Sequence, residues 1–225
     1  MWCVADLDEE YVTNMEDVLA LYEKPYDARA PVVCLDEKPV SLHAEVRPSR
    51  PARPGHLAKR DNEYERRGTA NLFGIVEPKG GRHLTCATHD RSGRAFARQI
   101  HAVVAAYPRA RTIHLVMDNL NTHREKALID HFGPRTGGAL WRRLSVHYTP
   151  KHGSWLNQAE IELSLVSRQC LGRRRIAALR ALQAETRAWT ARANRRKTQI
   201  NWRFSRKDAR RKFSYKRNLS KRSET

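Results

Sequence analysis

The chain has 225 residues and a formal net charge of +19, with 43 Lys and Arg against 24 Asp and Glu. This length suits a single catalytic domain with a sizeable mixed core. The charge is uneven, because residues 168–225 hold 20 Lys and Arg against 3 Asp and Glu, whereas residues 1–167 hold 23 against 21. Such a basic block indicates a polyanionic partner, since Lys and Arg neutralise phosphates whatever the base sequence. A merely solvated tail is the alternative.

Composition also excludes several classes of protein. No apolar run approaches the roughly 18 residues of a membrane span and no signal peptide is visible, so we expect a cytoplasmic protein without a membrane partner. The four cysteines show no Cys-x-x-Cys pair, which argues against a zinc site or a disulfide framework. We expect buried, reduced thiols at Cys3, Cys34, Cys86 and Cys170.

The first predicted element is a helix over residues 8–23, because its apolar residues recur at helical spacing. Strand-like segments follow at residues 31–35, 40–46, 69–76 and 83–88. Residues 47–60 contain three prolines among basic residues, and we predict an exposed loop there. The turn-like joins between the strands indicate an antiparallel meander.

In the second half of the chain, helices and strands alternate. Asp90 or Ser92 can cap a helix, and Gly133-Pro134 should end a short helix that begins at Thr122. Two further strands are predicted at residues 112–117 and 144–148, with a loop at 135–143 between them. Three helices follow: one capped by Ser154, one at residues 176–195, and a short one after Ser205. Asp208 would complete a capping box at the start of the last helix.

Three acidic signatures stand out: LDEKP (residues 35–39), VMDNLNTH (116–123) and WLNQAE (155–160). Asp36 and Asp118 each follow an apolar strand, and Glu160 lies on a later helix. Acids at the ends of two strands and on a helix can meet at one point. Mg²⁺ takes oxygen ligands, and two such ions can clamp the attacking and leaving oxygens of a phosphodiester. The pattern therefore predicts a metal site for phosphodiester chemistry.

Neighbouring acids leave alternatives. Asp36 and Glu37 are adjacent on a strand and point to opposite faces, so only one can join the site directly. We expect Glu37 to pair with Lys38 or a nearby arginine. Glu160 and Glu162 lie about 200° apart around a helix, and the more polar side of that helix favours Glu160. An isolated acid in the position of Asp118 would equally suit an Asx turn.

Taken together, LDEKP, VMDNLNTH and HYTPKHGSWLNQAEIELSLVSRQCL resemble the catalytic domain of bacterial insertion-sequence transposases of the mariner-like superfamily, the IS six-thirty family, over residues 2–213. The resemblance implies a ribonuclease-H-like α/β fold with a mixed five-stranded sheet flanked by helices. It selects Asp36, Asp118 and Glu160 as the Asp-Asp-Glu triad. The implied parts are an N-terminal helix and linker (1–30), the catalytic core (31–172) and a basic helical C-terminal extension (173–225).

The same resemblance implies metal-dependent DNA cleavage and strand transfer, supported by two Mg²⁺ (or Mn²⁺) ions. The implied partners are the double-stranded DNA of transposon ends and target, and a second copy of the chain in a homodimer, acting at the bacterial nucleoid. The 41 residues between Asp118 and Glu160 exceed the superfamily's usual spacing, and the loop predicted at 135–143 accommodates the surplus.

Such transposases carry helix-turn-helix modules before this domain, and none is recognisable here, so we expect poor recognition of element ends. The alternatives are an inactive remnant that only binds DNA and a host nuclease of the same fold.

Further side chains are candidates for contacting DNA or supporting the acids. The DNA-binding candidates are Lys151, His152, Arg168, Arg173, Arg174 and Arg175. The candidates for orienting a carboxylate or contacting phosphate are Asn119, Asn121, His123 and Asn157. Trp155 is expected to pack in the core, with base stacking as the alternative.

Overall fold

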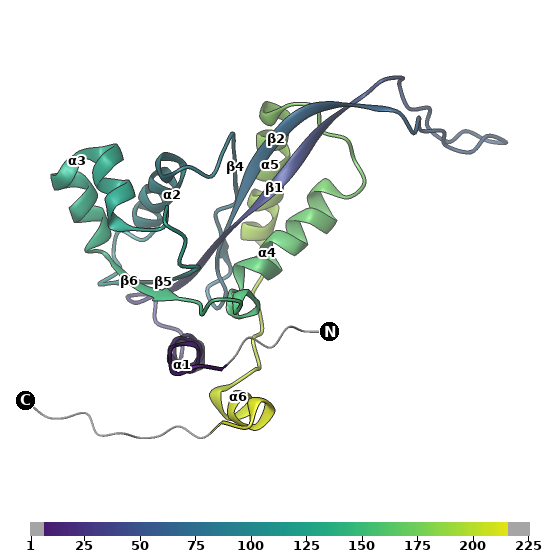
Figure 1. Cartoon of the computed structure of the whole chain (residues 1–225). Helices are drawn as coiled ribbons and strands as arrows, with labels where there is room; N and C mark the ends of the chain where they lie inside the picture. Colours follow the sequence, from purple (N-terminus) through teal and green to yellow (C-terminus); the bar gives the residue numbers. More distant parts are fainter. Residues whose placement is uncertain (1–6, 216–225) are drawn as a thin grey trace, which may run out of the picture.

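The computed structural model describes residues 7–215 (Figure 1). The strands are β1 (Val32–Glu45), β2 (Tyr64–Glu77), β3 (Arg82–His83), β4 (Cys86–Thr88), β5 (Ile113–Met117) and β6 (Leu144–Tyr148). The helices are α1 (Glu9–Glu23), α2 (Gly93–Ala106), α3 (Glu125–Trp141), α4 (Ala159–Val166), α5 (Leu179–Arg196) and α6 (Arg206–Phe213), with a 3₁₀ turn η1 (Ser154–Leu156) and a π-helical turn η2 (Ser167–Leu171).

The strands form one mixed sheet in the order β3-β2-β1-β5-β6, with β4 also paired to β2. β1 is antiparallel to β2 and parallel to β5, and β5 is parallel to β6. This arrangement agrees with the predicted ribonuclease-H-like fold. The sheet has six strands rather than five, because the strand predicted at 83–88 divides into β3 and β4, which pair with different parts of β2.

Each face of the sheet has its own covering helices. Successive residues of a strand point to opposite faces. In β1, Val33 and Leu35 accordingly join a buried cluster with α2 and α3, whereas Cys34 joins one with α1 and η1. A third cluster joins α4 and α5 to β1 and β2. Figure 1 shows α2 and α3 grouped on one side of the long strands, with α4 and α5 on the other.

The two strands predicted at 31–35 and 40–46 are one continuous strand, β1. Residues 36–39 pair with β2 without interruption, from Asp36 opposite Gly74 to Pro39 opposite Asn71. Pro39 lies beyond the stretch Val32–Cys34 that pairs with β5, and a proline is tolerated where a strand is an edge. The interruption predicted between residues 35 and 40 is therefore absent.

The prediction of a loop at 135–143 was also wrong, because α3 extends to Trp141. Gly133 does stop the first part of the helix, with a left-handed φ of 81°. Pro134 then starts a second helical part, since its fixed φ and missing N–H suit the first position of a helix. Gly137 lets this part pack on the first, because a Cβ there would lie 2.6 Å from the backbone of Leu128.

Both C-terminal helices pack onto the rest of the structure. In α5, Trp189 is buried in the third cluster. The predicted capping box of Ser205 and Asp208 is present at the start of α6. This helix lies on α1, where Arg210 makes two hydrogen bonds to Glu16, of 2.7 and 2.9 Å. The described part of this region is therefore an ordered part of the structure, packed on the rest.

Several smaller predictions concern single side chains. Cys34 and Cys170 are buried free thiols as expected, Cys86 is half-buried, and Cys3 lies outside the described residues. The ring of Trp155 packs edge-on against the ring of Phe204, with centroids 5.4 Å apart, in agreement with the prediction that it packs rather than stacks on a base. Within residues 7–215, no helix combines the length and apolar character that crossing a membrane requires.

Candidate active site

The register of the sheet brings Asp36 and Asp118 side by side. β1 and β5 are parallel and pair as far as Cys34 and Val116. Both aspartates lie two residues further along, so they are level on strands about 4.8 Å apart. The two aspartates thus lie at the same end of the sheet, where the parallel pairing stops, and the charge of Asp118 acts on Asp36.

The third acid comes from α4. Glu160, in its first turn, is exposed, and its charge acts on Asp36. Glu162 is instead 0% exposed. Its two carboxylate oxygens lie 2.9 Å from His83 Nδ1, and one accepts a hydrogen bond from the Thr85 hydroxyl (3.1 Å). The helix therefore holds Glu162 in the core and leaves Glu160 on the side of the aspartates.

A glycine sets how closely α4 approaches the sheet. Gly74 is the β2 residue opposite Asp36. A Cβ at this position would lie 2.7 Å from Cγ and 2.8 Å from Cδ2 of Leu163, which is almost one helical turn after Glu160. Because Gly74 has no side chain, α4 can lie directly on the strand that flanks Asp36.

Asn157 fixes the start of the same helix. Its Nδ2 donates to the carbonyl of Leu35 (2.8 Å), and its Oδ1 accepts from the amide of Ala159 (3.1 Å). Asn157 thus ties the start of α4 to the residue before Asp36, while the N-cap position itself is occupied by Gln158. The predicted cap, Ser154, was wrong, because it begins the separate turn η1.

The electrostatics of Asp36 reflect this crowding. Burial raises the pKa of its carboxyl to about 7, and the charges of Asp118, Glu37 and Glu160 add to the rise. One hydrogen bond opposes it, from the amide of Glu37 (2.8 Å). Asp36 therefore needs a nearby positive charge to be fully ionised at neutral pH.

His123 supports Asp118 from behind. Its ring is 1% exposed and stacks on Phe96, with centroids 4.6 Å apart. Nδ1 lies 2.6 Å from Asp118 Oδ1 and Nε2 lies 3.4 Å from Glu37 Oε2. Burial alone would lower the pKa of His123, but these two carboxylates outweigh burial and raise it to about 9. The imidazolium therefore bridges Asp118 and Glu37 at neutral pH.

This contact corrects the expected partner of Glu37. Its side chain is 3% exposed and points to the face opposite Asp36, where His123 lies. Lys38 is directed elsewhere because it follows Glu37 on the strand, and its amine donates to the hydroxyl of Ser167 (3.0 Å).

The three carboxylates suit a divalent metal chemically, although they are not already drawn into a closed ligand sphere. In the described part of the chain, no three His, Cys, Asp or Glu side chains are grouped tightly enough to enclose an ion. The donors are all oxygens, and the pKa of Asp36 is raised first by burial and then by neighbouring negative charges, which a cation would neutralise. Asp36, Asp118 and Glu160 are therefore the residues that could hold Mg²⁺ or Mn²⁺.

A groove of about 690 Å³ opens beside Asp118. Its lining includes Lys151 and His152, both exposed, and Asn119. His152 adopts a left-handed φ of 63°, in the turn that precedes η1. Asn121 instead lines a separate recess near α2 and α3, so the structure does not bring it to the groove.

The predicted DNA-binding arginines divide into two kinds. Arg168 and Arg173 are exposed. Arg174 pairs with Glu185 (3.0 Å), with both side chains about half exposed. Arg175 is held inside the protein, because its side chain is 12% exposed and pairs with Glu45 (2.8 Å). Its guanidinium is thus occupied by internal contacts.

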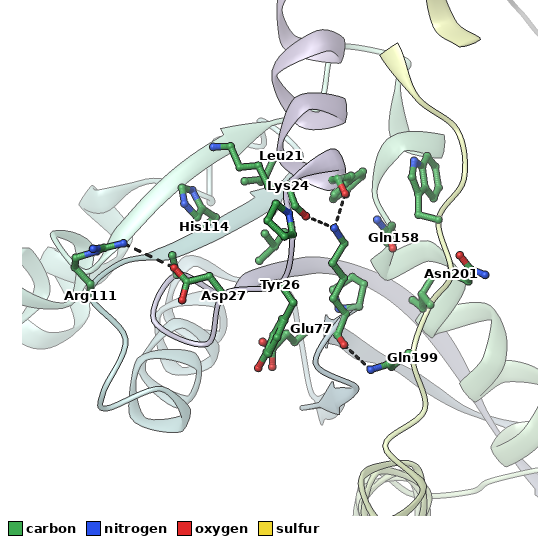
Figure 2. Close-up of a pocket in the computed structure, with 18 residues that line it drawn as sticks. Leu21, Lys24, Tyr26, Asp27, Glu77, Arg111, His114, Gln158, Gln199 and Asn201 are labelled. Atoms are coloured by element: carbon green, nitrogen blue, oxygen red, sulfur yellow. Dashed lines mark hydrogen bonds and ion pairs between the residues drawn. The ribbon is translucent and has the colours of Figure 1, made fainter. Parts of the chain in front are cut away.

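A second cavity, of about 710 Å³, lies away from the carboxylates (Figure 2). It is bordered by Val32 and His114, at the amino ends of β1 and β5. Lys79 crosses it and donates to the carbonyls of Tyr22 (2.7 Å) and Lys24, and so caps the end of α1. The three acids lie at the other end of the parallel pairing. This cavity is therefore a gap between packed secondary-structure elements and not the candidate site.

Residues 31–183 match the sequence profile described as DDE superfamily endonuclease. The chain belongs to this family. The match includes the strands and the helix that carry Asp36, Asp118 and Glu160. No curated protein matches the chain in sequence.

Solved structures of Mos1 mariner transposase share the fold of this DDE superfamily member. The pre-cleavage Mos1 transpososome has a TM-score of 0.57 at 16% identity, covering 88% of this chain and 61% of that one. The Mos1 paired-end complex with Mn has a TM-score of 0.56 at 15% identity, with 88% and 62% covered. The Mos1 catalytic domain has a TM-score of 0.52 at 15% identity, with 88% and 91% covered. The chain thus spans about three fifths of the Mos1 chains in the complexes.

Sequence reasoning missed the packing that places Glu160. The signal for Gly74 was present, because a single glycine inside the apolar run of residues 72–76 indicates close approach of another element. The pairing of His83 with Glu162 had no comparable signal, since 79 residues separate the two.

Proposed function

We propose that this DDE superfamily member is the catalytic domain of an insertion-sequence transposase of the IS six-thirty family, which cuts and joins DNA with Mg²⁺ or Mn²⁺. The observation that supports the proposal is that Asp118, after a second strand, and Glu160, on a helix, are close enough for their charges to act on Asp36. The charges of the other two acids act on Asp36, whose pKa is raised to about 7.

Two bound ions would supply activation of the attacking oxygen and neutralisation of the leaving one. Asp36, Asp118 and Glu160 would hold them. His123 keeps Asp118 at the strand end, and Asn157 holds the start of α4 against β1. Both act as positioning residues, since neither needs to touch DNA.

The groove beside Asp118 is the proposed path of a DNA strand. Lys151 and His152 line it and are exposed, so they can pair with phosphates as the strand passes Asp118. Asp8 and Glu10 line the same groove, which limits how closely a phosphate can approach its α1 side.

The test is cleavage of plasmid DNA that carries the element's ends, with Mg²⁺, Mn²⁺ or no metal. We expect metal-dependent cuts at the ends and joining of the released 3′ ends to target DNA. D36N, D118N and E160Q should each lower both steps by about 10³-fold, whereas E162Q, the matched control on the same helix, should retain activity. Cleavage without joining would point to a nuclease instead. Cleavage that survives all three substitutions would refute the assignment.

The further proposals concern partners. We propose a homodimer on paired transposon ends, and weak discrimination of those ends by these 225 residues. Competition binding between terminal-repeat and scrambled duplexes at fixed salt tests the second point. A preference of roughly 10³-fold, typical of a specific DNA binder, would contradict it.

A further inference from the structure

β1 and β2 continue beyond the sheet as a two-stranded projection that ends in residues 46–63, here called the arm. Figure 1 shows it extending away from all the helices. Every residue from 46 to 60 is exposed. Because the arm has no hydrophobic core, its conformation depends on its own backbone hydrogen bonds and on a bound partner.

The arm is an ordered hairpin rather than a slack loop. Arg50 pairs with Lys59 through two backbone hydrogen bonds (2.8 and 2.9 Å), and Arg53 pairs with His56 in the same way (3.0 and 2.8 Å). The tip turns at Pro54-Gly55, where Gly55 has a φ of 77°, as a type II turn requires. The sequence RPSRPARPG repeats Arg-Pro every three residues, so each proline stiffens the chain beside an arginine.

Charge in the arm is concentrated at its tip. No acid occurs between Glu45 and Asp61. Arg47 pairs with Asp61 (3.5 Å) near the base. Arg50, Arg53 and Lys59 form no ion pair with any acid of residues 7–215. The hairpin also sets Arg50 opposite Lys59, and like charges directly opposite are destabilising unless an anion lies between or beside them.

The base of the arm is held by the non-helical segment between η2 and α5. Arg175 donates to Glu45 and to the carbonyl of Glu63 (both 2.8 Å), and lies over the ring of Tyr64. The amide of His43 donates to the carbonyl of Ile176 (3.0 Å). The arm therefore has a fixed direction relative to the active site.

We propose that the arm grips the phosphate backbone of duplex DNA through Arg50, Arg53 and Lys59, outside the active-site groove. The proposal rests on the proposed DNA chemistry of Asp36. From Asp36 to Arg50 is 14 residues, which at about 3.3 Å each is at most about 46 Å, or about 13 base pairs of duplex. The arm thus contacts DNA up to a little more than one helical turn from the scissile phosphate.

The first test compares R50Q/R53Q/K59Q with the control R98Q/R109Q/R135Q, which removes the same charge from exposed positions in the region of α2 and α3. Binding to a generic duplex is measured across a salt series. Three lost phosphate contacts lower the slope of log affinity against log salt by about 2.7. Raising salt from 50 to 200 mM should therefore weaken the wild type about 40-fold more than the arm variant. An equal slope change in the control variant, or none in the arm variant, overturns the proposal.

The second test locates the contact by hydroxyl-radical footprinting on an end-containing and a generic duplex. On both, arm-dependent protection should disappear in the arm variant, while D118N keeps it and loses cleavage. If the wild-type protein shows this protection but never cleaves DNA, the proposal for the arm stands and the catalytic proposal is refuted. Leu57 at the tip is 86% exposed, so sedimentation is also measured. A changed oligomeric state with unchanged DNA binding would show that the arm binds another protein chain instead.

Discussion

Replacing Gly74 with alanine should disturb the active site without touching any acid. The new Cβ would lie 2.7 Å from Leu163 Cγ, against about 3.5–4.0 Å for an ordinary carbon contact. Leu163 is 5% exposed and cannot swing into solvent, so α4 must move by about 1 Å. Overpacking of this size costs about 1–3 kcal/mol of stability, or a Tm lower by about 2–12 °C.

The same shift moves Glu160 away from Asp36, and a misplacement of about 1 Å can lower the rate about 10²-fold. Metal-dependent plasmid cleavage and thermal melting are measured for G74A, L163A and the double variant. L163A removes the two atoms that the new methyl group would meet, so in the double variant this methyl group partly fills the space that the leucine leaves. The double variant should lose less stability than the sum of the single changes. Full activity of G74A, or strict additivity in the double variant, would refute this account of the helix position.

Three further predictions follow from the buried contacts. E160Q should lower cleavage by about 10³-fold with little change in Tm, because Glu160 is exposed, whereas E162Q should cost about 1–3 kcal/mol by weakening its bond to His83. Burial lowers the pKa of His83, but Glu162 outweighs burial and raises it above 6.5. The protonated pair therefore stabilises the fold below about pH 6.5, and this stabilisation is lost as pH rises through the pKa of His83 in the folded protein. In urea titrations, the difference in unfolding free energy between wild type and H83Q should therefore shrink from about pH 6 to about pH 9. A difference that stays constant over this range would contradict the prediction. A209E should release α6 from α1 and expose it to limited proteolysis, because Ala209 is 0% exposed, and unchanged proteolysis would contradict the docking.

The sequence could predict the elements whose signals are local. The stripe of α1, the cap Ser92 of α2 and the capping box of α6 depend on residues a few positions apart, and all three are present. The apolar runs before Asp36 and Asp118 likewise predicted both strands. Parallel strands with an acid at equivalent positions then bring the acids together by geometry alone.

What the sequence could not predict depends on partners distant along the chain. Residues 31–35 and 40–46 were predicted as separate strands because the pairing of residues 36–39 with β2 is not visible locally. The helix after Pro134 was not predicted. Gly137 and Gly138 have low helix propensity, and the packing against Leu128 that compensates for them is a tertiary contact. The partner of Glu37 was missed for the same reason, since His123 is on another element.

The docking of α6 on α1 has a consequence for how the protein folds during synthesis. Arg210 and Glu16 are separated by 194 residues. Contacts of such high sequence separation form late and slow folding. While the ribosome is still making α5, the apolar side of α1 that receives α6 stays uncovered, and exposed apolar surface of this kind favours aggregation. Translation stopped before Arg206 should therefore yield an aggregation-prone product rather than a shorter domain of equal stability.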